Sequence, residues 1–579
     1  MRQQRYEFIF LFFCVMMWIS SCDTKKQLME NHPNIILIMT DDQGYGDLGV
    51  TGNSIIETPN IDAMASKSAT MSNFYVSPVC APTRASLMTG RYNYRTGVID
   101  TYVGRAMMHT DEVTIAEILK KAGYATGIFG KWHLGDCYPM RPLDQGFDES
   151  MVLKGGGLAQ PSEPFENKRR YTDPVLFHNG HMVQTLGYCT DVYFRSATGF
   201  IKKNVEAEKP FFVYLPTNAP HGPFHDVPEE LLNVYRKMDL SSISFEEKLD
   251  NERLAAIFAM IGNVDQNIGR LFQTIEQLGI QKNTIVVFLT DNGPNTRRYV
   301  GELRGMKGEV HEGGIRAPFY MYWPDVFKGD EYSDVRVAHY DLMPTLLEVA
   351  GVSLPEGLTI DGRSFLPLLK GKDISWPDRN LFLQWHRGEE PQPFKHFSMV
   401  GQKWKLLSAD SADFELYDLE TDPGESHNLA DEKPELLEKM KNGYMTWFDD
   451  VSSTRENNYA KPRIVIGSDA EVETVLTAQD WLRTAGRGWG AKGKWLLTVE
   501  GPATFDVTIR VSESKPGWHG SLKLGEVVVD KVFSPNDDKV VFEGIYLEPG
   551  DIDLEATVTQ GDKIEPRLHV IVKKGGVNN

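Results

Sequence analysis

The sequence predicts an α/β protein with a mixed, largely parallel sheet flanked by helices, then a smaller α+β C-terminal subdomain and an appended antiparallel β-sandwich. Three observations support this: four apolar runs of strand length, helical patterns between them, and a C-terminal segment in which apolar and polar residues alternate. With 579 residues, the chain is long enough for roughly two to four domains with sizeable cores.

Each of the four apolar runs ends in a polar cluster. Continuous apolar strands are typical of parallel sheets that helices cover on both faces, and helical patterns over residues 113–122 and 254–278 supply such helices. Since ligands bind at the carboxyl ends of the strands in open α/β sheets, the clusters predict one shared site. The runs cover residues 35–39, 125–129, 211–215 and 285–289, and the clusters are Thr40-Asp41-Asp42, Gly130-Lys131-Trp132-His133, Asn218-Ala219-Pro220-His221 and Thr290-Asp291-Asn292-Gly293.

The pattern changes after about residue 371. Short strands over residues 404–407 and 415–419, followed by a helix over residues 433–448, predict a subdomain at 371–452. Residues 452–462 are polar and typical of a linker.

Regular alternation from residue 463 predicts the β-sandwich over residues 463–579. We expect it to brace the rest of the chain; a glycan-binding module and a contribution to an active-site rim are the alternatives, since fold does not decide among them. Its tryptophans are either exposed binding residues or, more commonly, core residues. The alternating faces are Phe505, Val507, Ile509 and Val511, and Ile552, Leu554, Ala556 and Val558; the tryptophans are Trp481, Trp489, Trp495 and Trp518.

The N-terminus has the pattern of an export signal. A basic start precedes an apolar stretch over residues 8–19, shorter than the roughly 20 residues of a membrane-spanning helix. The stretch ends in Ile19-Ser20-Ser21-Cys22, which resembles the lipobox of bacterial lipoproteins, where cleavage leaves the cysteine lipidated. We expect a signal peptide at 1–21, a tether at 22–32, and a chain lipid-anchored in the periplasm or on the outer membrane or cell surface of a bacterium. An ordinary signal peptide with a chance cysteine is the alternative.

Composition and charge exclude several classes of protein. The chain is 41% hydrophobic and 24% charged, as in globular proteins. Lys and Arg number 61 against 80 Asp and Glu, a formal net charge of −19, which argues against nucleic-acid binding driven by overall charge. If the protein handles an anion, its positive charge must therefore be local.

Five cysteines do not make a disulfide framework in a chain this long. Cys14 leaves with the predicted signal peptide, and Cys22 is the residue expected to carry the lipid. Cys137 and Cys189 form either one bridge or two buried thiols. Cys80 has no partner in this scheme, and the residues around it in the sequence indicate its role.

Cys80 lies in the motif Pro78-Val-Cys80-Ala-Pro-Thr-Arg84-Ala-Ser-Leu-Met-Thr-Gly90-Arg91. The motif resembles the signature of the sulfatase family of the alkaline phosphatase superfamily: Cys or Ser, any residue, Pro, a small residue and Arg, then two apolar residues and Thr-Gly. The resemblance covers roughly residues 33–450, and it implies an alkaline phosphatase-like catalytic domain at 33–370. The other motifs in family order are Asp41-Asp42, Gly130-Lys131-Trp132-His133, His221, Asp291-Asn292-Gly293, Lys307 and Glu312-Gly-Gly-Ile-Arg316.

The resemblance implies that a maturation enzyme oxidises Cys80 to formylglycine, whose hydrated aldehyde supplies the nucleophile. The chemistry agrees, because a thiolate attacking sulfur would leave a stable adduct, whereas a geminal diol expels sulfate when its second hydroxyl loses a proton. The alternative for Cys80 is a buried structural thiol.

Asp41, Asp42, Asp291 and Asn292 form an all-oxygen set, which suits a hard cation and disfavours Zn²⁺. The resemblance implies Ca²⁺, with Mg²⁺ as the alternative at the same ligands, and it adds residue 80 to the ligands. Helix N-caps and a turn are the other interpretation of these residues.

Local positive charge comes from basic residues near the same motifs. The resemblance implies that Lys131 and Lys307 hold the sulfate, that His133 and Arg84 position the nucleophile, and that His221 protonates the leaving oxygen.

Weaker candidates for substrate contacts are His311 and Arg316, together with His178 and His181. A solvated loop residue or a structural salt bridge is the alternative for each.

The sequence therefore predicts a sulfuric ester hydrolase of the arylsulfatase type that acts on a sulfated glycan, with galactose or N-acetylgalactosamine sulfate as the specific hypothesis. A phosphodiesterase or phosphonate hydrolase of the same superfamily and a catalytically dead glycan-binding surface protein are the alternatives; the Lys131 and Lys307 pair favours sulfate.

Overall fold

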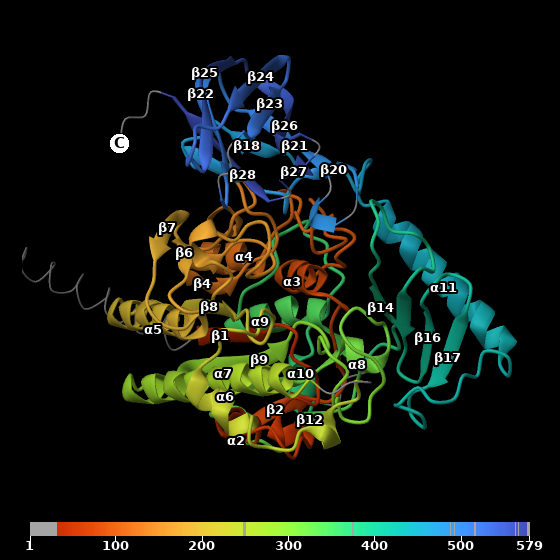
Figure 1. The fold of residues 1–579 in the computed structure, drawn as a ribbon. Coiled ribbons are helices and arrows are strands. Elements are labelled where there is room, and N and C mark those ends of the chain that lie inside the picture. Colours follow the sequence, from red (N-terminus) through yellow and green to blue (C-terminus); the bar gives the residue numbers. More distant parts are fainter. Residues whose placement is uncertain are drawn as a thin grey trace, which may run out of the picture.

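The computed structural model describes residues 32–246, 250–372, 376–486, 488–490, 492–513, 517–561, 563–565 and 567–575. The predicted signal peptide and residues 22–31 of the predicted tether lie outside this range. Figure 1 shows three parts: helices and strands of the N-terminal part, a second sheet with a long helix beside them, and a β-sandwich against one end. No helix among the described residues is both long and apolar enough to cross a membrane.

The N-terminal part is built on a ten-stranded sheet in the order β12-β2-β11-β9-β1-β8-β4-β5-β6-β7. Five central strands run parallel, and β11, β6 and β7 pair antiparallel, so the prediction of a mixed, largely parallel sheet is confirmed. The central strands are β9 (Thr284–Thr290), β1 (Asn34–Thr40), β8 (Phe211–Pro216), β4 (Ala125–Lys131) and β5 (Glu149–Leu153); the others are β11 (Phe319–Tyr322), β2 (Ser68–Met71), β12 (Tyr332–Ser333), β6 (Val175–His178) and β7 (His181–Gln184).

Helices cover both faces of this sheet, which explains why its central strands are apolar throughout. In β1, Leu37 belongs to the core beneath α3, α4 and α9, and its neighbour Ile38 to the core beneath α2, α5 and α7. The helices are α2 (Pro59–Ala65), α3 (Cys80–Thr89), α4 (Ile115–Lys121), α5 (Cys189–Glu206), α6 (Glu229–Tyr235), α7 (Asn251–Gln277), α8 (Glu312–Ile315), α9 (Leu342–Ala350) and α10 (Leu366–Leu369); a small sheet of β3 (Phe74–Tyr75), β10 (Arg316–Ala317) and β13 (Val337–Ala338) accompanies them.

The C-terminal subdomain is an antiparallel sheet covered by one helix. The expected strand at 404–407 falls in β16, and that at 415–419 matches β17 except for residue 419, which follows the strand. Tyr444 and Trp447 of the helix pack against the sheet. The elements are β14 (Leu381–Gln384), β15 (Phe397–Val400), β16 (Trp404–Ser408), β17 (Phe414–Asp418) and α11 (Pro434–Ser452).

The β-sandwich consists of a seven-stranded and a four-stranded sheet. One pair departs from the antiparallel expectation, because β18 runs parallel to β21. The chain between them passes through β19 in the other sheet, and such a crossover lets a strand return in the same direction. The first sheet contains β18 (Ile464–Ile466), β20 (Leu482–Ala485), β21 (Lys492–Val499), β23 (His519–Leu524), β24 (Val527–Val532), β26 (Gly550–Gln560) and β27 (Lys563–Ile564); the second contains β19 (Glu473–Leu476), β22 (Ala503–Val511), β25 (Lys539–Leu547) and β28 (Leu568–Lys574).

Three of the four sandwich tryptophans are core residues. Trp481, Trp495 and Trp518 are buried. Trp489 is partly buried and meets Tyr102 of the N-terminal part edge to face, with ring centroids 5.0 Å apart. Trp489 is therefore the member of this set that lies at a junction between domains.

The sandwich core continues into the N-terminal part. Val103 and Cys137 belong to the same hydrophobic cluster as the sandwich interior. The backbone N–H of Gly104 donates to the Gln479 carbonyl at 2.7 Å, and that of Asp136 donates to Asp480 Oδ2 at 2.8 Å. The sandwich thus rests directly on loops of the N-terminal part.

The cysteines within the described residues, Cys80, Cys137 and Cys189, form no disulfide. Cys137 and Cys189 are both buried and unbridged, and they belong to different hydrophobic clusters. Of the two alternatives given above, one bridge or two buried thiols, the structure therefore has the second.

Candidate active site

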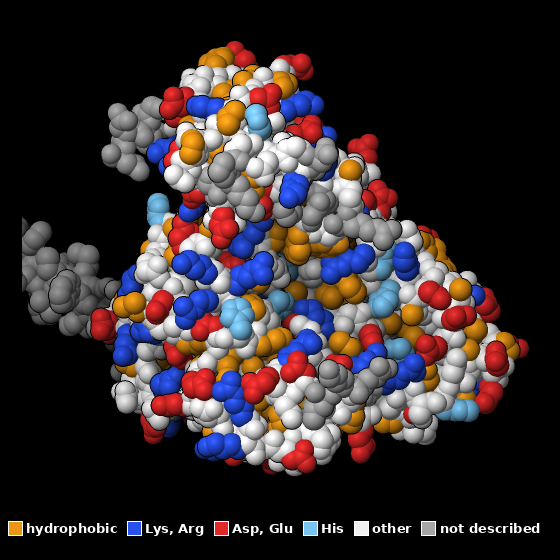
Figure 2. Space-filling view, viewed as in Figure 1, with side chains coloured by type: hydrophobic (Ala, Val, Ile, Leu, Met, Phe, Trp, Pro, Cys, Tyr) orange, Lys and Arg blue, Asp and Glu red, His pale blue; other side chains and the backbone are white. Residues whose placement is uncertain are grey.

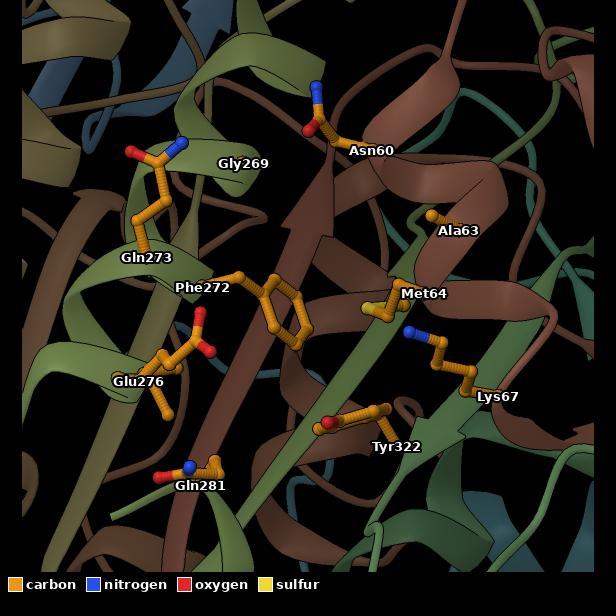
Figure 3. A pocket seen from close by; sticks show the side chains of 11 residues that line it. Asn60, Ala63, Met64, Lys67, Gly269, Phe272, Gln273, Glu276, Gln281 and Tyr322 are labelled. Atoms are coloured by element: carbon orange, nitrogen blue, oxygen red, sulfur yellow. The ribbon is translucent and has the colours of Figure 1, made fainter. Parts of the chain in front are cut away.

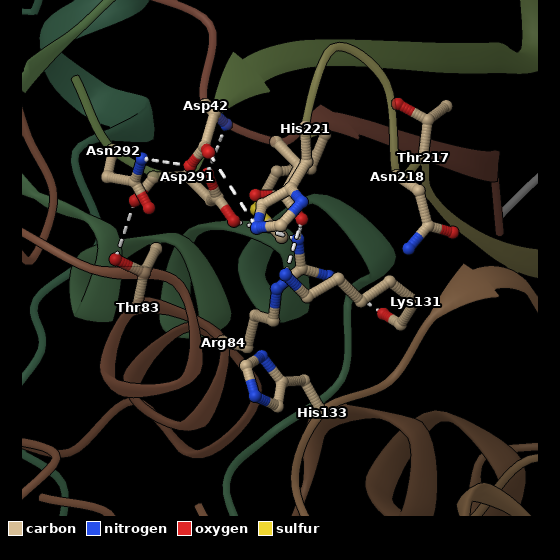
Figure 4. A network of polar contacts seen from close by, with 12 residues as sticks. Asp42, Thr83, Arg84, Lys131, His133, Thr217, Asn218, His221, Asp291 and Asn292 are labelled. Atoms are coloured by element: carbon tan, nitrogen blue, oxygen red, sulfur yellow. Dashed lines mark hydrogen bonds and ion pairs between the residues drawn. The ribbon is translucent and has the colours of Figure 1, made fainter. Parts of the chain in front are cut away.

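The carboxyl ends of four neighbouring strands, β9, β1, β8 and β4, meet at one edge of the sheet. Thr40 pairs with Thr290, so Asp41 and Asp291, the next residues of each strand, lie side by side. On the other side of β1, the backbone N–H of Asp41 donates to the Ala219 carbonyl at 3.1 Å. The structure thus brings the four polar clusters together, as Figure 4 shows.

Cys80 is the first residue of α3, and it is buried, with 2% of its surface exposed. Its sulfur and carboxylate oxygens of Asp41 and Asp291 all lie within 4.8 Å of one another. Burial raises the pKa of the thiol above its ordinary value, and the charges of Lys131 and Lys307 offset this only in part. An unmodified Cys80 is therefore a poor nucleophile in this site, because the thiolate is the reactive form.

Carboxylates crowd this end of the sheet. The pKa of Asp291 is raised to about 7 by burial and by the neighbouring charge of Asp41. Burial also disfavours the charged form of Asp42, but the charges of Lys307 and His221 outweigh it and hold the pKa of Asp42 well below its ordinary value. The crowding is what a bound cation relieves.

The donor atoms fit a hard divalent cation. Asp41 Oδ1 and Asn292 Oδ1 are buried and have no hydrogen-bond partner among the described residues. The amide Nδ2 of Asn292 donates to Asp42 Oδ1 at 3.0 Å, so its oxygen is left for a ligand. Oxygen donors of three carboxylates and one amide predominate here over the single thiol of Cys80 and the imidazole of His221, and such an oxygen-rich set suits Ca²⁺ or Mg²⁺ better than Zn²⁺.

The side chain of Arg84 is hydrogen-bonded to three groups of this site. Its fully buried guanidinium donates to Asp291 Oδ2 at 2.8 Å, to Asp41 Oδ2 at 3.4 Å and to the Lys131 carbonyl at 2.7 Å. Lys131 Nζ, also buried, lies 2.5 Å from Asp41 Oδ2. Arg84 thus fixes two candidate cation ligands and one lysine at once, through the helix turn that also presents Cys80.

The tautomer of His133 follows from its contacts. Nε2 lies 2.7 Å from the Thr101 carbonyl oxygen, so this nitrogen carries the proton and donates. Burial together with the charges of Lys131 and Arg84 holds the pKa of His133 well below its ordinary value, so the ring is neutral near pH 7. Nδ1 has no partner among the described residues and is left as an acceptor.

His221 and Lys307 form the exposed side of the site. Their side chains are 16% and 20% exposed, whereas that of Lys131 is fully buried. The Nδ1–H of His221 donates to the Gly222 carbonyl at 2.7 Å, which leaves Nε2 for proton transfer, 3.8 Å from Asp42 Oδ2. Lys307 Nζ pairs with Asp42 Oδ1. These two side chains are therefore partly accessible to solvent, whereas Lys131 is not.

The weaker candidates are engaged elsewhere. His311 contacts Glu415 at 3.5 Å, and Arg316 donates to the Ser72 carbonyl at 3.0 Å and stacks over the Tyr45 ring, 5.3 Å from its centroid. These contacts match the structural alternatives given above. His178 and His181 lie on the β6–β7 hairpin at the edge of the sheet.

Two polar residues of the site were not singled out from the sequence. Thr83 Oγ1 donates to the Asp291 carbonyl at 2.7 Å, and Asn295 Nδ2 donates to Asp42 Oδ2 at 3.0 Å. Thr83 lies inside the Cys80 motif, at its small-residue position, and Asn295 follows Asn292 by three residues. Its place in the motif was the sequence signal for Thr83, and proximity to a motif was the signal for Asn295.

A cavity of about 380 Å³ lies between α2 and α7, where Phe272 packs edge to face with Tyr322 (Figure 3). Gln281 in its wall comes just before β9, so the cavity is toward the amino ends of the parallel strands. Ligands of open α/β sheets bind at the opposite ends, where Cys80 and the carboxylates lie.

Comparison with known proteins agrees with this geometry. A family model described as Sulfatase matches residues 33–352, and one described as N-sulphoglucosamine sulphohydrolase, C-terminal, matches residues 306–446. The chain is 32% identical to the N-acetylgalactosamine-6-sulfatase of Mus musculus over 386 residues, which cover 62% of this chain and 69% of that protein. It is also 32% identical to the arylsulfatase A of Homo sapiens over 459 residues, covering 71% of this chain and 86% of that protein.

A solved structure has the same fold over most of the chain. The structure described as Ps i-CgsB in complex with k-i-k-neocarrahexaose has a TM-score of 0.64 and 28% identity, and covers 74% of this chain and 95% of that one. The family match spans Cys80, the carboxylates and the lysines described above. The chain therefore belongs to the sulfatase family, whose members are sulfuric ester hydrolases.

Proposed function

We propose that the protein releases inorganic sulfate from a sulfate ester on a sulfated glycan, with formylglycine made from Cys80 as the nucleophile and Ca²⁺ as the cation. The observation that carries the proposal is the position of Cys80: a buried, unactivated thiol among two lysines and two carboxylates, at the start of a helix. A thiol held in this way is of little use unless it is converted to another group.

Converted by a maturation enzyme and hydrated, residue 80 supplies a geminal diol, of which one hydroxyl attacks sulfur and the other loses a proton to release sulfate. The neutral Nδ1 of His133 is an acceptor without a partner among the described residues, and it orients a hydroxyl or takes its proton. Arg84 keeps the helix turn that carries residue 80 tied to Asp291.

Asp41, Asp42, Asp291, Asn292 and residue 80 would hold the cation, which would supply positive charge to the nucleophile and to the sulfate. Lys131, which pairs with Asp41, and Lys307, which pairs with Asp42, neutralise the sulfate oxygens. His221, with Nε2 on the exposed side, gives a proton to the departing alkoxide; the sulfate beside it stabilises the imidazolium that this requires.

The substrate class rests on the relatives. The N-acetylgalactosamine-6-sulfatase of Mus musculus and the structure solved with a neocarrahexaose are both similar to this chain over most of its length, which favours a carbohydrate sulfate. N-acetylgalactosamine or galactose sulfate is the specific hypothesis.

We also propose that the protein is exported and anchored through a lipid on Cys22. The basic start, the apolar stretch and the Ile19-Ser20-Ser21-Cys22 sequence support this. Metabolic labelling with a radioactive fatty acid tests it: label in the wild type and none in Cys22→Ser is the expected result.

The test of the catalytic proposal uses purified protein co-produced with a formylglycine-generating enzyme. Sulfate release is measured from an aryl sulfate and from a panel of regiospecifically sulfated sugars, with an aryl phosphodiester alongside. Turnover of the sulfates, and of a sulfated galactose or N-acetylgalactosamine above the others, is expected. Faster turnover of the phosphodiester would contradict the proposal and favour the phosphodiesterase alternative.

A further inference from the structure

A groove of about 630 Å³ lies where three parts of the chain meet. Tyr102 of the N-terminal part, Arg387 and Glu389 of the loop after β14, and Arg483 of β20 in the sandwich line it. We call it the rim groove. Ligand clefts typically measure about 300–1,000 Å³, so the rim groove has room for a small ligand. Figure 2 shows basic side chains and histidines around a hollow in the face where these parts come together.

The rim groove adjoins the active site on the His133 side. Tyr102 directly follows Thr101, whose carbonyl accepts the hydrogen bond from His133 Nε2. The guanidinium of Arg387 lies 3.3 Å from Thr101 Oγ1 and 4.2 Å from the centroid of the Tyr102 ring. One residue thus separates the groove from the His133 contact.

The rim groove also adjoins the active site near Lys307. The ring of Trp385 lies so close to Gly308 that a Cβ there would come within 3.2 Å of it. Gly308 directly follows Lys307, and its carbonyl contacts His396. Trp385 also contacts Arg387 of the groove, with the guanidinium 5.1 Å from its ring centroid, so one side chain links Gly308 to the rim groove.

Arg387 is held in place but stays half-exposed. Its guanidinium lies between the rings of Tyr102 and Trp385, 4.2 Å and 5.1 Å from their centroids, and Nη1 pairs with the buried Asp100 at 2.6 Å. Its side chain is 53% exposed. An arginine that is stacked and paired at one end presents its charge in a fixed position.

A second cationic group surrounds Glu389. Arg105, Arg483 and Lys461 all pair with this one carboxylate, the last two at 2.8 Å and 3.4 Å. Burial holds the pKa of Lys461 below its ordinary value, and the charge of Arg105 adds to the effect. With Arg387 and Asp100, this cluster has four cations against two carboxylates in a chain of net charge −19. Arg387 and Arg483 line the groove and are each paired with one carboxylate, whereas Arg105 and Lys461 are buried, at 1% and 9% exposed.

We propose that the rim groove is a second anion subsite, which binds a carboxylate or sulfate on the sugar next to the one that loses its sulfate. The inference rests on the proposed glycan substrate and adds to it a requirement for a neighbouring anionic sugar. Arg387 and Arg483 are the two cations exposed enough to contact it, at 53% and 24%. Tyr102, which lines the groove, offers an aromatic ring for the sugar itself. The sandwich thus supplies part of the substrate surface through Arg483.

The test compares three disaccharides that share one N-acetylgalactosamine 6-sulfate: one joined to a uronate, one to the uronate reduced to a neutral sugar, and one to a 2-sulfated uronate. The quantity measured is kcat/KM for each anionic disaccharide divided by kcat/KM for the neutral one. The wild type should prefer the two anionic disaccharides to the neutral one. A further gain with the 2-sulfated uronate over the plain uronate would show that the groove binds the sulfate, and equal values would show that it binds the carboxylate. Salt should reduce the preference, because the charges are partly exposed.

Arg483→Gln and Arg387→Gln should each reduce that preference about tenfold, the usual effect of losing a hydrogen bond to a charged group. Lys523→Gln is the matched control: Lys523 lies on β23 of the same sandwich, 57% exposed and paired with Glu555, and its removal should leave the preference as in the wild type. Thermal unfolding of each variant shows that it is folded. Arg483→Gln is the safer variant, since Glu389 keeps two other cations.

An unchanged preference in both folded arginine variants, or no preference in the wild type, would overturn the subsite. If the wild type hydrolyses none of the three disaccharides, the proposed substrate is wrong. The subsite is then tested separately, by calorimetric measurement of the binding of the 2-sulfated disaccharide to Cys80→Ala protein. Weaker binding after Arg483→Gln in that background supports the subsite, and equal binding rejects it.

Discussion

His133 and Gln479 share one hydrogen-bond acceptor, the carbonyl oxygen of Thr101. His133 Nε2 lies 2.7 Å from it, and Gln479 Nε2 of the sandwich lies 3.0 Å from it. The sandwich therefore contacts the group that sets the tautomer of a histidine in the candidate active site.

Gln479→Leu should lower kcat on a small aryl sulfate about fivefold, because a neutral hydrogen bond contributes about 1 kcal/mol and its loss frees the Thr101 carbonyl to shift. The KM should change little, since Gln479 touches no substrate. Steady-state kinetics with a thermal unfolding control measure this. An unchanged kcat in a folded variant would show that Thr101 is held by its other contacts.

Cys80→Ala should abolish turnover and leave the fold intact, because the residue makes no bond that the helix turn depends on and only its converted form supplies the nucleophile. Peptide mass analysis of active wild-type protein should show residue 80 as formylglycine. Cys80→Ser is less decisive, because some maturation systems accept serine. Full activity with an unmodified thiol would refute the mechanism.

Asp41→Asn and Asp291→Asn should each lower activity by several orders of magnitude, because the cation loses a ligand and the sulfate loses charge stabilisation. Asp551→Asn in the sandwich is the matched control. Chelation should remove activity, and Ca²⁺ or Mg²⁺ should restore it. Undiminished activity in metal-free protein would exclude the cation.

The same carboxylates predict how cation binding depends on pH. The pKa of Asp291 is raised to about 7 without a cation, so a proton competes for this ligand below neutral pH. Affinity should therefore rise between about pH 6 and pH 8, as titration calorimetry can show. A constant affinity across this interval would mean that Asp291 is not a ligand.

His221 predicts the alkaline limb of the pH profile. Burial lowers its pKa below the ordinary value, with Asp42 opposing. A general acid must be protonated, so kcat should fall as the pH rises through the pKa that His221 has with substrate bound. His221→Gln should lower kcat and flatten this limb, most of all with a poor leaving group. A limb that persists in the variant would assign the proton to another residue.

Asp480 predicts a pH-dependent stability. Burial and the charge of Asp136 raise the pKa of Asp480 well above its ordinary value in the folded protein. The folded state thus binds this proton more tightly than the unfolded state, and the carboxyl group costs stability as the pH rises from about 4 through the folded pKa. Asp480→Asn should therefore raise Tm at pH 7, and the gain should shrink toward pH 4. A lower Tm at pH 7 would show that the charged form is stabilised, with Lys154 as the nearby cation.

The sequence by itself determined the central strands and the chemistry at their ends. Apolar runs such as residues 35–39 predict strands buried on both faces, because helices on both sides leave no polar face. The acids and bases that follow the strands meet because carboxyl ends of parallel strands share an edge. The Cys80 motif is equally local, since one helix turn fixes the spacing from Cys80 to Arg84.

Only the tertiary structure decided which distant residues join the site. Gln479 and Arg483 follow Thr101 by more than three hundred positions, yet they line its loop, because the sandwich packs its core against Val103. The tertiary structure also placed His311 on Glu415, a residue of the C-terminal subdomain more than a hundred positions away. Periodicity and motif spacing report the surroundings of a residue along the chain, whereas these contacts depend on how separately formed surfaces pack together.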